Sequence, residues 1–248
     1  MWSFGAMCDE FCISTRLFLK LDLHPSREAS LHFFEQIRRS FPTMTRMRRR
    51  EDGGLLLDEE EDQGEGRRFL RTDPTSIRFG VHDPRNPAAI ELLARRVFDL
   101  APAALSLSDL DYDYMDVLFA FDLEYRGNHD ELIAETFFAN HPFQRALLDD
   151  ASTVIECQPF MGASLGEGCD RQLYLEVRGR TSAYEVRTGE FDAAPLSVNL
   201  TARRYWSGAG ATPQDVHSEL LTHATQSVQQ RIVPQIVQPL AAAIASRR

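Results

Sequence analysis

The 248-residue chain has a single lysine, only four cysteines and no run of eighteen apolar residues. Without such a run we expect no membrane-spanning helix and no membrane partner. Residues Met1 to Met7 contain no basic side chain and are followed by Asp9 and Glu10, so we expect no export signal. The scattered cysteines do not form the dense framework of a secreted disulfide-rich domain. We therefore expect a soluble protein of the cytoplasm.

Acidic residues outnumber basic ones, 37 to 27, which gives a formal net charge of −10. A negative mean field repels phosphate backbones, so nucleic acid is an unlikely partner on charge alone. The hydrophobic share of 43% and the charged share of 26% are those of an ordinary globular protein and exclude a wholly disordered chain.

The first half of the chain begins with a half-buried strand over residues 15–23, in which Leu17, Leu19, Leu21 and Leu23 alternate with other residues. Ser26 can then cap an amphipathic helix that runs to about Ser40. Turn residues separate the short extended segments that come next, at 44–50, 55–59, 67–72 and 76–82. A second helix is predicted from Asn86 and Pro87, with Pro102 as its end.

The second half shows the same order of elements. Residues 113–125 alternate as a strand, and Asn128 and Glu131 form a capping-box pattern before a helix. Extended segments are predicted at 153–160, 172–178, 183–187 and 196–205. A long helix is expected from Thr212 and Pro213, with a kink or break at Pro234 and Pro239.

Both halves therefore read as strand, helix, four strands and helix, which predicts a tandem duplication. The predicted class is α+β, with tandem β-α-β4-α repeats and antiparallel sheets packed on helices. We predict a disordered tail at 1–10, a first repeat at 11–110, and a second repeat at 111–248 that includes the long C-terminal helix. This order resembles that of TATA-box-binding-protein-like folds, whose repeats are β-α-β4-α units, and more loosely that of helix-grip folds.

Residues Gly162-Ala163-Ser164-Leu165-Gly166 match the G-x-S-x-G pattern of a nucleophile elbow, so a serine hydrolase is one functional hypothesis. An elbow requires a tight turn from a strand into a helix, whereas a strand is predicted from Gln172 onward. We therefore favour a hairpin loop here and assign no catalytic residue.

Metal-binding patterns are incomplete. Asp109, Asp111 and Asp113 begin like a calcium loop, but Tyr114 and Ala120 occupy the positions of its glycine and its last glutamate. The cysteine spacings do not match a zinc site. We expect neither a metal nor a cofactor.

Alternate positions of the predicted second sheet carry arginines and tyrosines on one polar face. The candidate ligand-binding residues are Tyr174, Arg178, Arg187, Arg203 and Tyr205. Arginine forks bind anions and tyrosines offer flat contact area, so the leading hypothesis is a non-enzymatic binding or interaction module. It would use this face, or a groove between the repeats, to hold an unknown protein or a small anionic ligand. Three alternatives stay open: a solvated face of Glu–Arg pairs, a serine hydrolase that uses Ser164, and nucleic-acid binding by the arginine strands around Arg46–Arg50.

Overall fold

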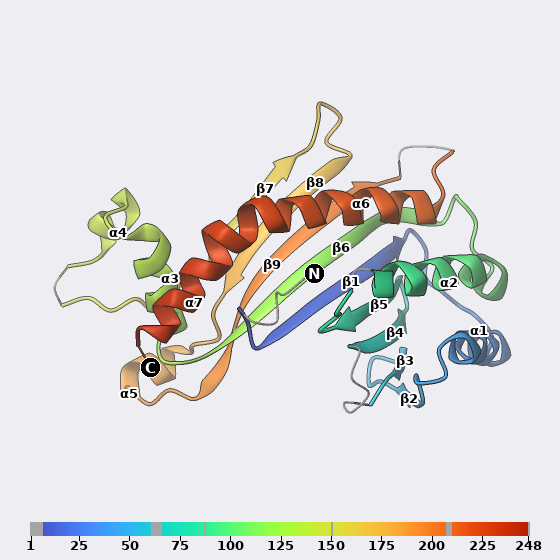
Figure 1. Cartoon of the computed structure of the whole chain (residues 1–248), viewed down its shortest axis with the longest axis horizontal. Helices are drawn as coiled ribbons and strands as arrows, with labels where there is room; N and C mark the ends of the chain where they lie inside the picture. Colours follow the sequence, from blue (N-terminus) through green and yellow to red (C-terminus); the bar gives the residue numbers. More distant parts are fainter. Residues whose placement is uncertain (1–6, 61–65, 87, 150, 207–209, 248) are drawn as a thin grey trace.

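A computed structural model describes residues 7–60, 66–86, 88–149, 151–206 and 210–247. It is a mixed α+β fold built on one nine-stranded sheet with strand order β2-β3-β4-β5-β1-β6-β9-β8-β7 (Figure 1). The strands are β1 (Glu10–Leu19), β2 (Arg46–Arg49), β3 (Leu55–Asp58), β4 (Arg67–Asp73), β5 (Ser76–His82), β6 (Tyr112–Arg126), β7 (Phe160–Ser164), β8 (Arg171–Arg178) and β9 (Ala193–Tyr205). The helices are α1 (Arg27–Ser40), α2 (Ala88–Leu105), α3 (His129–Phe138), α4 (Pro142–Leu147), α5 (Ala183–Thr188), α6 (Pro213–Ser227), the π-helix η2 (Val228–Val237) and α7 (Gln238–Ala245).

The sheet is antiparallel, and its middle strand β1 pairs with β6. Each has strong period-two alternation, so one set of side chains faces the helices and the other set faces away. Ile13 and Leu17 of β1 and Val117 and Phe119 of β6 are buried on the first side. Because β1 belongs to the first half of the chain and β6 to the second, one sheet continues across both halves.

In Figure 1 the long helical stretch from α6 through η2 to α7 runs across the front of the sheet. Helix α6 packs on β6 and β9, while α2 packs on β5 and on α1. The side chains beneath them form one cluster of buried hydrophobic residues that draws on both halves of the chain. We call the opposite side of the sheet, which carries residues such as Arg16 and Asp116, the open face.

The predicted α+β class and antiparallel sheet are confirmed, but the tandem β-α-β4-α order is not. Up to Leu105 the order is strand, helix, four strands and helix, as expected. The second half instead has the additional helix α4, and three strands and the helix α5 where four strands were predicted. Residues 153–159 are not in a strand, and β7 begins only at Phe160.

The predicted strand at 183–187 is wrong because local capping makes this segment a helix. The Ser182 hydroxyl accepts from the Glu185 amide while the Glu185 side chain accepts from the Ser182 amide, which is a capping box. Gly189 closes the helix in the left-handed conformation, with φ of 72°. Two reciprocal hydrogen bonds and a glycine stop therefore outweigh the period-two pattern of this short segment.

The predicted helix end at Pro102 is wrong, whereas the kink or break predicted at Pro234 corresponds to a change from α-helix to π-helix. Pro102 lies inside α2, which continues to Leu105, and Pro234 lies inside η2, after which the chain stays helical to Ala245. A proline near a helix end removes a single hydrogen bond, and the wider π-type turns of η2 accommodate Pro234 within the helical path. The long C-terminal helix is thus continuous over the sheet.

The predicted N-terminal tail lies mostly outside the described residues, which start at Met7. Within them, β1 already begins at Glu10, and Met7 and Cys8 pack against the core. The boundary between residues 110 and 111 stays a prediction. In the part of the chain that is described, no helix has both the length and the apolar character needed to cross a bilayer.

Candidate anion-binding face

Three arginines stand side by side on the open face, one on each of three neighbouring strands. Arg71 of β4 is directly opposite Arg78 of β5, and Arg78 is directly opposite Arg16 of β1. We call these residues the arginine row. Neighbouring strands are about 4.8 Å apart, so the row spans roughly 10 Å across the sheet. Like charges directly opposite each other destabilise a sheet, so the row needs compensating negative charge.

Asp73 supplies part of that charge to the two outer arginines. Its side chain contacts the Arg71 Nε and lies 3.6 Å from the Arg16 Nη2, and it is only 7% exposed. Arg71 also donates to Asp52 at 2.9 Å, and Arg16 donates to the Ser76 hydroxyl at 3.0 Å. Both outer arginines are therefore held in place by partners on the protein.

Arg78, in the middle of the row, has no carboxylate within ion-pair distance among the described residues. Its Nη2 donates to the Ser14 hydroxyl at 3.3 Å, and its guanidinium carbon is 5.8 Å from the centre of the Phe69 ring. Burial is the largest effect and lowers the pKa of Arg78 below its ordinary value; the charges of Arg16 and Arg71 also lower it, while Cys12 and Asp73 oppose the shift. Since arginine stays charged in proteins, Arg78 is a cation whose surroundings disfavour positive charge.

Arg203 of β9 continues the row beyond Asp116 of β6, which lies opposite both Arg16 and Arg203. It donates from Nε and Nη2 to the two oxygens of Asp116, at 2.7 and 2.8 Å. These hydrogen bonds raise the pKa of Arg203 above its ordinary value. Its guanidinium also stacks near three tyrosine rings, at 4.2 Å from Tyr114, 5.3 Å from Tyr174 and 5.9 Å from Tyr205. Arg203 is thus a fixed, neutralised cation beside a patch of aromatic rings.

The structure brings together three of the five candidate residues predicted from the sequence, namely Tyr174, Arg203 and Tyr205. Arg178 lies on the same face at the far end of β8, opposite Ser197. The placement of Arg187 on this sheet face is wrong, because Arg187 belongs to α5, where its guanidinium lies over the Tyr184 ring at 5.3 Å.

Sequence reasoning did not single out the arginine row. The alternation in β1 does place Arg16 on the polar side, and a similar alternation in β5 places Arg78 between the buried residues Ile77 and Phe79. Alternation within a strand predicts which side of the sheet a residue faces, but it does not predict which residue lies opposite on the neighbouring strand. Only the register between strands that are more than fifty residues apart along the chain brings Arg16 next to Arg78.

The arginines around Arg46–Arg50, which suggested nucleic-acid binding, are largely paired with carboxylates. Arg46 and Arg48 both contact Asp58, and Arg50 lies 3.3 Å from Asp52. Such exposed pairs contribute little stability, yet they neutralise the charge that a phosphate backbone would require.

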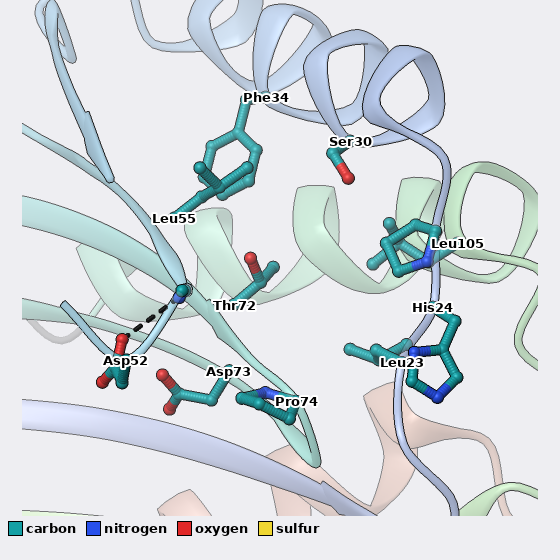
Figure 2. Close-up of a pocket in the computed structure, with 13 residues that line it drawn as sticks. Leu23, His24, Ser30, Phe34, Asp52, Leu55, Thr72, Asp73, Pro74 and Leu105 are labelled. Atoms are coloured by element: carbon teal, nitrogen blue, oxygen red, sulfur yellow. Dashed lines mark hydrogen bonds between the residues drawn. The ribbon is translucent and has the colours of Figure 1, made fainter. Parts of the chain in front are cut away.

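A hollow of about 310 Å³ lies at the edge of the sheet, where the β3 and β4 ends meet α1, α2 and the β1–α1 connection. Figure 2 shows Asp52, Asp73 and Thr72 on one side and Leu23, His24 and Leu105 on the other. Both carboxylates already have donors, since the Gly54 amide donates to Asp52 at 3.1 Å and Arg71 contacts both acids. The hollow therefore presents no unpaired charge to a ligand.

Ser164 does not sit in a nucleophile elbow. It is the last residue of β7, and the chain turns back into β8 rather than into a helix. Its hydroxyl donates to the Gly166 carbonyl at 2.7 Å. His217 is buried against the rings of Phe79 and Phe98. The local geometry is that of a hairpin, as the sequence analysis favoured.

Among the described residues, no three His, Cys, Asp or Glu side chains are grouped closely enough to hold a metal ion. Comparison with known proteins adds no functional information, because no family model, no curated protein and no solved structure matches this chain.

Proposed function

We propose that this protein is a non-enzymatic binding module that holds an anionic ligand on the open face of its sheet, with Arg78 at the centre of the site. The proposal rests on the strand register, which makes the three cations Arg71, Arg78 and Arg16 direct cross-strand neighbours. A bound anion would relieve the repulsion between these cations and would give Arg78 a direct ion-pair partner, which no carboxylate of the described residues provides.

The span of the row supports a ligand with more than one anionic group. A single phosphate or carboxylate can reach one or two of the guanidinium groups. The length of the arginine row, roughly 10 Å, is matched better by a ligand that contains several linked anionic groups. Arg203 and the rings of Tyr114, Tyr174 and Tyr205 adjoin the row and would contact any flat part of the ligand.

The proposal includes a cytoplasmic location. Burial raises the pKa of Cys8 and of Cys12 to about 12, so neither forms a reactive thiolate at neutral pH. We also propose that the two halves of the chain arose by duplication. This is supported by the adjacent positions of β1 and β6 and by the flanking positions of β5 and β9.

Titration calorimetry with inorganic phosphate, pyrophosphate and tripolyphosphate at low salt tests the binding proposal. We expect affinity to rise along this series, and Arg78→Gln to weaken tripolyphosphate binding at least about tenfold, because one charge-assisted hydrogen bond contributes roughly 1.5–3 kcal/mol. Arg95→Gln, an exposed site on α2, removes the same charge elsewhere and should leave the affinity unchanged. Absence of binding by the wild-type protein, or equal losses in both variants, would contradict the proposal. A single-stranded oligonucleotide in the same assay tests the nucleic-acid alternative.

A further inference from the structure

The two edges of the sheet differ in a way that affects association. The edge strand β2 carries Arg46, Arg48 and Arg49, and charged side chains of this kind protect an edge from pairing with another chain. The other edge strand, β7, has the sequence Phe-Met-Gly-Ala-Ser, without charge. All five of its residues are exposed, including Phe160 at 65% and Met161 at 74%. Figure 1 shows β7 at the outer margin of the sheet.

The hydrogen-bonding pattern shows which backbone groups of β7 remain available. The Val177 amide donates to the Pro159 carbonyl, and the Leu165 amide donates to the Arg171 carbonyl. Since antiparallel strands alternate, the odd-numbered residues of β7 point their backbone groups toward β8. The amides and carbonyls of Phe160, Gly162 and Ser164 therefore point outward, where the sheet ends.

Strand β7 is complementary to a second copy of itself. In an antiparallel pair centred on Gly162, every outward-pointing residue faces another outward-pointing residue, as the hydrogen-bonding pattern requires. Large side chains then face small ones, because Phe160 is opposite Ser164 of the copy and Met161 is opposite Ala163 of the copy. The absence of charge in β7 also matters, because a strand with charges near its centre would repel its own copy in a protein of net charge −10.

We propose that two copies of this chain associate through β7, pairing antiparallel about Gly162 so that two nine-stranded sheets become one. The interface is isologous, with the same patch on both copies and a two-fold axis at Gly162. It covers Phe160 and Met161 and gives partners to three amides and three carbonyls of each copy. The arginine row lies on β4, β5 and β1, at least four strands from β7, so dimerisation does not require anion binding, although Phe160 stacks on Tyr174 of the tyrosine patch with 5.7 Å between ring centres.

Sedimentation equilibrium over a wide range of protein concentration measures this association. We expect a monomer–dimer equilibrium in the wild-type protein. Met161→Lys should weaken dimerisation at least about fivefold, because it places two cations diagonally across the axis and removes apolar burial. Leu92→Lys is the matched control, since it adds the same charge at an exposed apolar residue of α2 and should leave the equilibrium unchanged.

A charge pair tests the register itself. Ala163→Glu should also weaken the homodimer, whereas an equimolar mixture of the Met161→Lys and Ala163→Glu proteins should associate more tightly than either variant alone. This follows because residue 161 of one copy faces residue 163 of the other. The Ser164 amide points outward and makes no hydrogen bond to β8. Ser164→Pro therefore removes an amide that only the dimer needs, so it should abolish dimerisation while the helical circular-dichroism signal is preserved.

A wild-type protein that is monomeric at every concentration would overturn the proposal. A dimer that persists unchanged in both the Met161→Lys and the Ser164→Pro proteins would overturn it as well. If the mixture associates no better than the separate variants, the register about Gly162 is wrong.

Discussion

Arg203 and Asp116 form a two-point ion pair across the register of β9 and β6, at 2.7 and 2.8 Å, and this pair separates the tyrosine cluster from the arginine row. Asp116 also faces Arg16 on its other side. Asp116 thus lies between two arginines, and its removal affects both stability and charge.

We predict that Asp116→Asn destabilises the protein by about 2 kcal/mol, because it leaves the half-buried Arg203 without its charged partner. The same change adds positive charge to the open face, so affinity for tripolyphosphate should increase. Urea denaturation and calorimetry on one preparation measure both effects. A variant that loses stability and affinity together would indicate that Asp116 only maintains the fold.

Stability should fall with acid because of His217. This side chain is fully buried against Phe79 and Phe98, and neither ring nitrogen has a hydrogen-bond partner in the described chain. Burial lowers its pKa from 6.5 to about 4. Between these values the unfolded state binds the proton and the folded state does not, so stability decreases as the pH falls from 6.5 toward 4.

The expected loss from this residue at pH 5 is about 2 kcal/mol relative to pH 7. His217→Phe keeps an aromatic ring in the core and should flatten this part of the pH profile in urea denaturation. His223→Phe, at an exposed position of α6, is the control and should retain the wild-type slope. Equal slopes in the wild-type protein and the His217→Phe variant would exclude His217 as the cause.

Asn128 is predicted to contribute more stability than an ordinary helix cap. Its Oδ1 accepts from the amides of Asp130 and Glu131, and its Nδ2 donates to the Val154 carbonyl at 2.7 Å. Asn128→Ala removes the cap, worth about 1 kcal/mol, and also leaves a partly buried carbonyl unpaired, at about 1–3 kcal/mol. Asn86→Ala, which removes only an exposed cap of α2, should cost about 1 kcal/mol. Thermal melts should therefore rank the two variants, and equal losses would argue against a role for the Val154 contact.

Ser164 should not react as a catalytic nucleophile. Its hydroxyl donates to the Gly166 carbonyl, and among the described residues no histidine is recorded as its hydrogen-bond partner. We expect no labelling of the folded protein by a fluorophosphonate probe, with peptide mass spectrometry as the readout. Labelling of Ser164 by the probe in the wild-type protein, with no labelling in the Ser164→Ala variant, would support the hydrolase hypothesis.

Local interactions explain which elements were predictable from the sequence. Alternation identified β1 and β6 because a strand with one buried face repeats every two residues, as Leu17 and Phe119 do. Hydrogen bonds between residues only two or three positions apart identified the starts of α1, α3 and α6, at Ser26, Asn128 and Thr212. The same rule accounts for the error at α5, where the Ser182–Glu185 capping box outweighs an alternating pattern.

By itself the sequence determined the α+β class, the strands β1 and β6 and the starts of α1, α3 and α6, because each depends on residues near one another in the chain. Only the tertiary structure decided that Arg16, Arg71 and Arg78 are neighbours and that β7 is an edge. Strand order and register are set by packing a whole sheet beneath its helices. Residues far apart in the chain become neighbours through that packing, and no local pattern encodes which ones meet.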